Sequence, residues 1–187
     1  MMIAFKGFDK DLTCTSSGNT YQYRLNVWNE ESEANCGANG MHWAENPLDC
    51  LSYYSDWNRA VYYMVAVDGD IDEDACDSKI SCTRLRLIKK LDMGEFVAHS
   101  LKYMLDHPLR SNNYRVCRDK GEDTGQGFVI VRGCNPKAKG TLGTVLGFAK
   151  EGRGIGEITE LGIHIVDGKE ILPDTWYNIR GRKVGNN

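Results

Sequence analysis

The chain has 187 residues, of which 41% are hydrophobic and 26% are charged, and its formal net charge is −3. These proportions are those of a globular protein rather than a disordered one, and the length suits one medium domain or two small ones. No apolar run approaches the roughly 20 residues that span a bilayer. The first residues lack a basic segment followed by an apolar one, so we also expect no secretory signal.

The distribution of basic residues and of cysteines argues against nucleic acid binding and against a zinc site. Lys and Arg are scattered, apart from the stretches 84–90 and 180–183, which does not favour direct nucleic acid binding because such binding needs a basic patch. The seven cysteines are an odd number and form no C-x-x-C pair, which indicates reduced thiols in a cytoplasm. Cys36, His42 and Cys50 are spaced too widely for a zinc knuckle, so we predict no metal and no cofactor.

Strands dominate the first half of the chain in our prediction. Residues 2–8 are predicted to form the first strand, residues 21–28 alternate ring or apolar side chains with polar ones, and 40–44 is a short extended piece. Residues 60–67 are apolar on both faces, which is typical of a covered central strand. We expect a turn at Asp68-Gly69 and a further strand at 79–88.

Two helices are predicted in this half. Asn46 can cap free N–H groups, Pro47 suits the first helical position, and Asp49 follows in the first turn, so a short helix should begin there. The second helix should begin after Asp92, because apolar residues then recur every three to four positions, and it should end before Pro108.

Composition places a domain boundary after the second helix. Residues 110–126 are polar and rich in turn-forming residues, and four short strands with turn signals follow them. We therefore predict an N-terminal domain at 1–109, a polar linker at 110–126 and a C-terminal β-meander at 127–187. The predicted class is α+β: an N-terminal mixed sheet with two short helices, followed by a small antiparallel β module.

An acidic segment at 68–74 is the first candidate site. Its alternate carboxylates resemble a calcium-binding loop, but the sixth position is Glu73 instead of Gly and the twelfth is Lys79 instead of Glu. A solvated loop or an acidic contact patch for a basic partner remains open. The residues of the candidate patch are Asp70, Asp72, Glu73 and Asp74.

Aromatic residues form the second candidate site. Tyr53, Tyr54 and Trp57 lie close together in the sequence, and such residues serve both cores and interface hot spots. His42, beside Trp43 and before the capped helix, is the histidine that we would test. No G-x-S-x-G elbow and no phosphate-cradling loop is present, so we predict no catalytic residues.

Several strings resemble a family of phage and prophage accessory proteins of gut Firmicutes. They are "AFKGFDKDLTC", "GMHWAENPLDCLSYY" and "VDGDIDEDACDSKISC" in the first half, and "SNNYRVCRDKGEDTGQGFVIVRGCNPKAKGTLGTVLGF" and "VDGKEILPDTWYNIRGRKV" in the second. Many members carry short Ser-Ala-Leu-Thr-Gly-Gly-like repeats between these parts, which this chain lacks. The resemblance implies an accessory protein that acts in a host bacterial cytoplasm, often against host defence, and carries over no functional residue.

Together these observations favour a non-catalytic binding protein. Our leading hypothesis is an inhibitor of a host immune effector such as a CRISPR–Cas nuclease, acting by surface occlusion, with the acidic segment as a substitute for phosphate. One alternative is an enzyme, because the order of "FKGF" and "GMHWAENPLDCLSYY" loosely resembles ADP-ribosyltransferase-like folds. Another is a nucleotide-signal sponge, which would need an apolar pocket with a few convergent polar groups. No membrane partner is expected.

Overall fold

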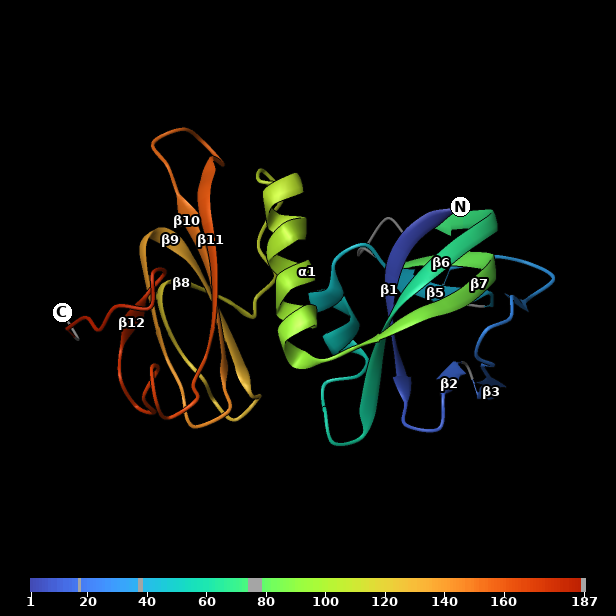
Figure 1. The fold of residues 1–187 in the computed structure, drawn as a ribbon. Coiled ribbons are helices and arrows are strands. Elements are labelled where there is room, and N and C mark those ends of the chain that lie inside the picture. The colour runs from blue at the N-terminus through green and yellow to red at the C-terminus, as the bar shows by residue number, and fades with distance from the viewer. Residues whose placement is uncertain (17, 37–38, 74–78, 186–187) are drawn as a thin grey trace. The chain divides into compact units, whose positions relative to one another are not determined.

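The chain divides into two compact units, Met1–Asp92 and Met93–Asn187, in a computed structural model (Figure 1). The structure describes all residues except 17, 37–38, 74–78 and 186–187. The boundary between the units differs from the linker that we predicted at 110–126. The polarity of that segment misled the prediction, because residues 116–122 form a strand that is paired within the C-terminal unit.

The predicted α+β class is wrong, because strands make up 49% of the chain and helices only 11%. Long strands replace expected turns and loops, and the first of the two helices is a single 3-10 segment. Among the helices that the described residues form, none has the length and apolarity needed to cross a membrane.

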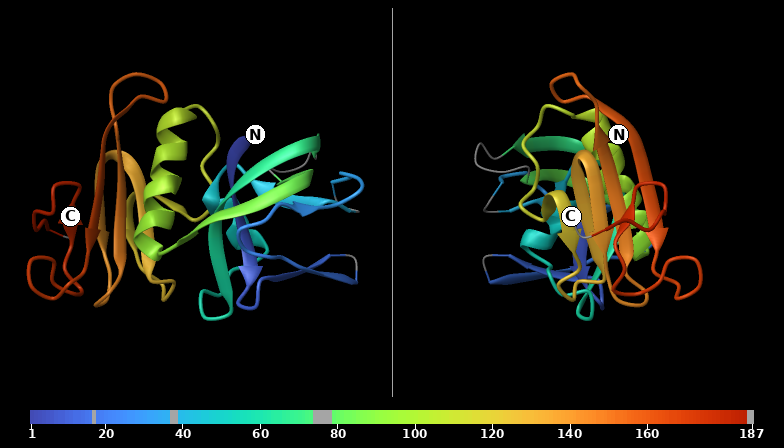
Figure 2. Two further views of the ribbon diagram at one scale, coloured as in Figure 1. Left: turned by 45° about the vertical axis from the view of Figure 1, so that its right-hand side comes forward. Right: turned by 90° about the vertical axis from the view of Figure 1, so that its left-hand side faces the viewer.

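Antiparallel strands build the N-terminal unit. Its described elements are β1 (Met2–Asp9), β2 (Thr13–Ser16), β3 (Asn19–Gln22), β4 (Asn29–Glu30), β5 (Met41–Ala44), η1 (Pro47–Ser52), β6 (Ala60–Glu73) and β7 (Lys79–Leu91). The pairings β1–β6, β6–β7, β7–β5 and β5–β1 close a ring of four strands (Figure 2). β4 extends β7, and β2 pairs with β3 as a separate hairpin. The ring encloses an apolar core that includes Ala4, Phe8, Met41, Val65, Cys82 and Leu85.

The expected turn at Asp68-Gly69 is wrong, because β6 continues to Glu73. Gly69 has a φ of +80°, and the register between β6 and β7 shifts at this point. A Cβ at Gly69 would lie 2.1 Å from Thr83 Oγ1, so the glycine permits a bulge against the neighbouring strand instead of a reversal. Residues 68–73 of the acidic segment are therefore the outer half of a strand and not a loop.

The strand predicted at 21–28 is also wrong beyond Gln22. Asn29 accepts a hydrogen bond from the Arg24 N–H at 2.8 Å and donates one to the Arg24 carbonyl at 3.1 Å. Asn26 between them has a φ of +61°. The side chain of Asn29 thus closes a turn that overrides the alternating pattern.

The start of the first predicted helix is confirmed. Asn46 accepts a hydrogen bond from the Leu48 N–H at 3.1 Å, and Pro47 occupies the first helical position. The helix is η1, whose inner side is buried through Pro47, Leu48, Cys50 and Leu51.

The C-terminal unit consists of one helix and a five-stranded sheet. Its described elements are α1 (Met93–Asp106), β8 (Val116–Glu122), β9 (Phe128–Lys139), β10 (Val145–Glu151), β11 (Ile158–Ile165) and β12 (Tyr177–Asn178). α1 packs on one face of the sheet, where Gly147 faces Val97 and Leu101. The opposite face buries an apolar cluster that includes Val129, Val131, Leu146, Phe148, Tyr177 and Ile179.

The predicted antiparallel meander is wrong, because β9 pairs in parallel with both β8 and β10. Parallel strands usually need a connection of a dozen or more residues, yet only residues 123–127 and 140–144 lie between these strands. Val116–Arg118 pairs with Ile130–Arg132, and Lys120–Glu122 pairs with Lys137–Lys139. Residues 133–136 therefore lie opposite Asp119 alone, so β9 departs from regular pairing with β8 at this point.

Candidate functional site

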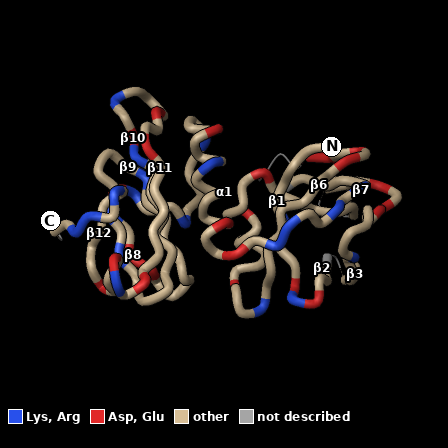
Figure 3. Tube along the Cα trace, viewed as in Figure 1, with Lys and Arg blue, Asp and Glu red and all other residues tan. Residues whose placement is uncertain are grey.

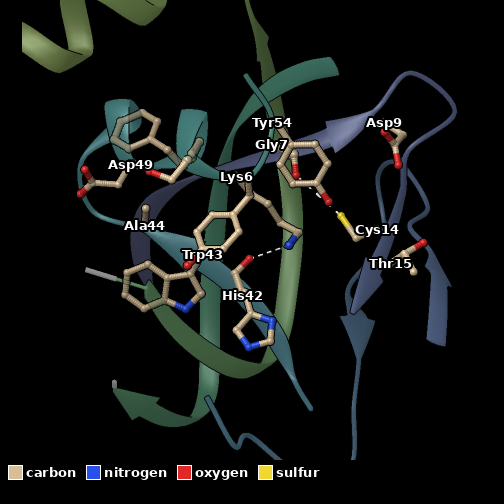
Figure 4. Close-up of a pocket in the computed structure, with 14 residues that line it drawn as sticks. Lys6, Gly7, Asp9, Cys14, Thr15, His42, Trp43, Ala44, Asp49 and Tyr54 are labelled. Atoms are coloured by element: carbon tan, nitrogen blue, oxygen red, sulfur yellow. Dashed lines mark hydrogen bonds between the residues drawn. The ribbon is translucent and has the colours of Figure 1, made fainter. Parts of the chain in front are cut away.

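The candidate site is a pocket of about 590 Å³ in the N-terminal unit (Figure 4). Its walls come from β1, β5 and η1, with Cys14 and Thr15 of β2 at one side. A volume of this size lies within the range of small-molecule sites. The pocket brings together segments that are up to about 50 positions apart, so no single sequence motif marks it.

Lys6 is the central residue of this pocket. On β1, Lys6 shares a face with Ala4 and Phe8, which are both fully buried. Its aliphatic stem therefore occupies a core position, and only 6% of the residue is exposed. Its ammonium group donates a hydrogen bond to the His42 carbonyl at 2.6 Å. It also lies 5.4 Å from the ring centroid of Phe8 and 5.1 Å from that of Tyr23.

Within the part of the chain that the structure describes, the ion pairs do not include Lys6. Burying a cation is costly unless a carboxylate or several hydrogen bonds compensate for lost hydration. One carbonyl and two ring faces provide part of that compensation. The ammonium group therefore has remaining capacity to bind an anion that enters the pocket.

Aromatic and polar side chains surround this cation. Trp43, Tyr53 and Tyr54 line the pocket together with His42 and Asp49. The Tyr54 ring lies directly on β1, since a Cβ at Gly7 would be 2.7 Å from Tyr54 Cδ2. Burial raises the pKa of Tyr54, so its hydroxyl stays protonated at neutral pH.

The cysteines near the site are poor candidates for a nucleophile. Burial raises the pKa of Cys50 to about 12 and that of Cys82 to about 11, so both remain thiols at neutral pH. Cys14 donates a weak hydrogen bond to the Gly7 carbonyl, with 3.6 Å between sulfur and oxygen. Outside the segments that the structure leaves undescribed, no group of three or more His, Cys, Asp or Glu side chains is arranged to hold a metal ion.

The structure separates the aromatic candidates. Tyr53 and Tyr54 line the pocket, whereas Trp57 packs against Tyr62 with 4.4 Å between ring centroids. Trp57 is therefore associated with packing and not with the pocket.

The acidic candidates lie elsewhere. Asp70, Asp72 and Glu73 are exposed on the outer half of β6 and do not line the pocket. The Asp72 carboxylate accepts a hydrogen bond from the Cys36 N–H at 2.7 Å. Asp74 lies outside the described residues.

The analysis of the sequence missed Lys6, although a signal was present. In the strand predicted at 2–8, Lys6 lies two positions from Ala4 and from Phe8, so it shares a face with apolar residues on both sides. The hydrogen-bond partner of Lys6, the His42 carbonyl on β5, depends on strand pairing, which the sequence pattern does not reveal.

The N-terminal unit also defines the family. The chain belongs to the family described as Domain of unknown function (DUF7666), which matches residues 2–99. That match contains every residue of the pocket and the first turns of α1. No curated protein and no solved structure matches the chain.

Proposed function

We propose that this chain is a non-catalytic binding protein whose N-terminal pocket holds a small anionic ligand of nucleotide size. The observation that carries the proposal is the buried ammonium group of Lys6, which faces a pocket and has no carboxylate among its described contacts. Burying the Lys6 ammonium group removes its hydration, which costs free energy. A role in binding a ligand accounts for this cost better than a role in packing does.

The other side chains that line the pocket restrict the class of ligand that it can bind. Tyr53 and Tyr54 offer ring faces on which a base can stack, while Lys6 can hold a phosphate. A nucleotide combines both features at the size of this pocket. The nucleotide-signal sponge, one of the alternatives from the sequence, is therefore the function that the geometry supports best.

The resemblance of the sequence to phage and prophage accessory proteins supports the biological part of the proposal. In this view the chain acts against a host immune effector by removing its nucleotide signal. Surface occlusion of a CRISPR–Cas nuclease is the second candidate, supported by the exposed carboxylates of Asp70 and Glu73 on β6.

Calorimetric titration tests the pocket. The probes are inorganic phosphate, ATP, NAD and a cyclic dinucleotide, each added to the wild-type chain and to Lys6→Met. We expect at least one nucleotide to bind, with an affinity about 10-fold to 100-fold lower for Lys6→Met because a charge-assisted hydrogen bond is lost. Lys10→Met removes the same charge from an exposed position outside the pocket and should bind like the wild type.

Two outcomes would contradict the proposal. If no probe binds, or if Lys6→Met binds as tightly as Lys10→Met, the pocket is not an anion site. Release of nicotinamide from NAD by the wild-type chain would contradict the non-catalytic part and support the ADP-ribosyltransferase-like alternative.

A separate assay addresses the second candidate. The double variant Asp70→Asn, Glu73→Gln removes two exposed carboxylates and leaves the pocket unchanged. If a purified Cas nuclease is inhibited by the wild type and escapes this variant while nucleotide binding persists, surface occlusion is the better description.

A further inference from the structure

The two edges of the C-terminal sheet differ in how they are protected. Among the described strands, β8 pairs with β9 alone and β11 pairs with β10 alone. β8 carries four charged residues in seven positions, and its pairing is irregular around Asp119, which has a φ of +58°. Charged side chains and irregularities of this kind keep an edge strand from pairing with another chain. β8 is therefore a protected edge.

β11 lacks these protections. Its eight residues contain no proline, lysine or arginine, Glu160 is their only carboxylate, and the trace of β11 in Figure 3 is largely uncharged. All eight residues are described and none of them is buried, and Ile163 and Ile165 are 38% and 55% exposed. A long apolar edge strand that stays open is a template for a further strand.

The backbone of β11 directs one set of hydrogen-bonding groups to the open edge. The Val166 N–H donates to the Thr144 carbonyl at 2.9 Å, so the polar groups of Val166 point toward the β10 side. The pairing then continues from Ile165 along β11 without a register shift as far as Glu160. Because such groups alternate along an antiparallel strand, the N–H and C=O groups of Ile165, Ile163 and Leu161 point away from β10.

The exposed isoleucines lie on the face of the sheet that α1 covers. Ile163 is paired with Gly147, which faces α1. Paired residues share a face and side chains alternate along a strand, so Leu161 and Ile165 lie on this face as well. α1 contacts β11 but leaves both isoleucines partly exposed. The open edge is thus bordered by apolar side chains that a further strand would cover.

β11 is complementary to a second copy of itself. In an antiparallel pair centred on Gly162, Leu161 lies opposite Ile163 of the second copy and Glu160 lies opposite His164. This register joins apolar residues on the α1 face and places no like charges opposite each other within the strand. It also places the outward groups of Leu161 and Ile163 in hydrogen-bonded pairs.

We propose that two copies of this chain pair through their β11 strands and form a symmetric dimer. Two-fold symmetry uses the same surface on both copies, so every contact is made twice. The two five-stranded sheets become one continuous sheet with both α1 helices on the same face. This interface lies in the C-terminal unit and does not depend on the function proposed for the Lys6 pocket.

Sedimentation equilibrium of the full chain tests the proposal at concentrations from about 1 μM to about 1 mM. We expect the mass to rise with concentration from that of one chain to twice that value. Hydrogen exchange gives an independent readout. The N–H groups of Leu161, Ile163 and Ile165 should exchange more slowly as the dimer forms, whereas the His164 N–H, which points toward β10, should be unaffected.

Substitutions at the open edge should weaken the dimer. Ile163→Pro removes an outward N–H without removing a hydrogen bond to β10. Because the group is lost from both copies, the dissociation constant should rise about 10-fold to 100-fold. Ile163→Lys should have a similar effect, since a lysine on an edge opposes pairing. The control, Ile88→Lys, replaces an isoleucine on β7 that is 42% exposed and should leave the dissociation constant unchanged.

Three results would overturn the proposal. A chain that is monomeric at every concentration would leave the open edge to a strand of a different protein. Equal dissociation constants for Ile163→Lys and Ile88→Lys would show that another surface joins the copies, and so would unchanged exchange of the Ile163 N–H in the dimer. Circular dichroism verifies that each variant is folded, and Ile163→Lys alone decides if Ile163→Pro is not.

Discussion

Two buried cations, one in each unit, are compensated in different ways. The Arg132 guanidinium donates hydrogen bonds to Glu151 Oε1 at 2.8 Å, to Asn112 Oδ1 at 3.0 Å and to the Pro108 carbonyl at 2.9 Å. Lys6 donates to the His42 carbonyl and otherwise meets aromatic rings. The first arrangement is that of a structural residue, and the second leaves room for a ligand.

This difference predicts the effect of Lys6→Met on stability. Replacing a buried charge by an apolar side chain of similar length is often neutral or stabilising. We expect the free energy of unfolding in urea to be unchanged or to rise by about 1 kcal/mol, although nucleotide binding is lost. A loss of about 3 kcal/mol would instead identify Lys6 as a structural residue.

Glu151 provides the matching prediction for Arg132. Glu151→Gln leaves the buried Arg132 without its carboxylate, so unfolding should become easier by about 3 kcal/mol. The control is Glu160→Gln, which breaks the ion pair with exposed Arg180 and should cost less than about 1 kcal/mol. Urea titrations of both variants decide between these values, and equal losses would contradict the structural role.

The same carboxylate predicts a pH dependence. Hydrogen bonds from Arg118 and Arg132 lower the pKa of Glu151 below its ordinary value of 4.5, against the opposing effect of burial. A group whose pKa is lowered by folding stabilises the protein fully above its unfolded pKa, and this stabilisation is lost as the pH falls through its folded pKa. Between pH 5 and pH 3, Glu151→Gln should therefore lose less stability than the wild type. Equal losses would show that other carboxylates dominate.

At the scale of elements, Asp123 explains how parallel strands are joined by short connections. Its Oδ1 accepts hydrogen bonds from the backbone N–H groups of Gly125, Gln126 and Gly127, at 2.9 to 3.2 Å. Its Oδ2 accepts one from the Thr144 hydroxyl at 2.9 Å. One carboxylate thus ties the connection after β8 to the connection after β9.

Substitution of Asp123 should therefore destabilise the C-terminal unit. We expect Asp123→Ala to cost about 2 to 3 kcal/mol, since four donors lose their acceptor. Thr144→Val removes the contact between the two connections together with a long hydrogen bond to the Thr141 hydroxyl, and it should cost about 1 kcal/mol. Thermal unfolding monitored by circular dichroism compares them, and a smaller effect of Asp123→Ala than of Thr144→Val would contradict this account.

At the scale of the whole molecule, the two units have separate cores. The closed ring, its apolar core and the Lys6 pocket all lie within residues 1–92. α1, the five-stranded sheet and its apolar cluster lie within residues 93–187. A unit that contains its own buried core can fold alone.

This division predicts that residues 1–92 form a folded fragment. We expect cooperative urea unfolding of that fragment and the same preference for Lys6 over Lys10 in nucleotide titrations as in the full chain. The fragment 93–187 should bind none of the nucleotide probes. A fragment 1–92 without cooperative unfolding would show that the ring needs the rest of the chain.

The local sequence determined the features that depend on neighbouring residues. The strand at β1, the cap at Asn46 and the apolar periodicity of α1 follow from patterns a few residues long, and the structure confirms them. Local patterns failed where a distant contact decided the outcome. At Gly69 we expected a turn, but a bulge against Thr83 lets β6 continue. Residues 116–122 are polar, yet they form a strand because they pair with β9.

The candidate pocket depended on tertiary structure, because strand register is set by packing over long distances. The strand predicted at 2–8 puts Lys6 on the same face as Ala4 and Phe8, but only the pairing of the strands brought η1 and the His42 carbonyl to it. Likewise, the basic residues appeared scattered along the chain until the register of β8 and β9 placed Lys120 opposite Lys137. The sequence alone determined the charges and the periodicity, while the fold decided which of those charges share a surface.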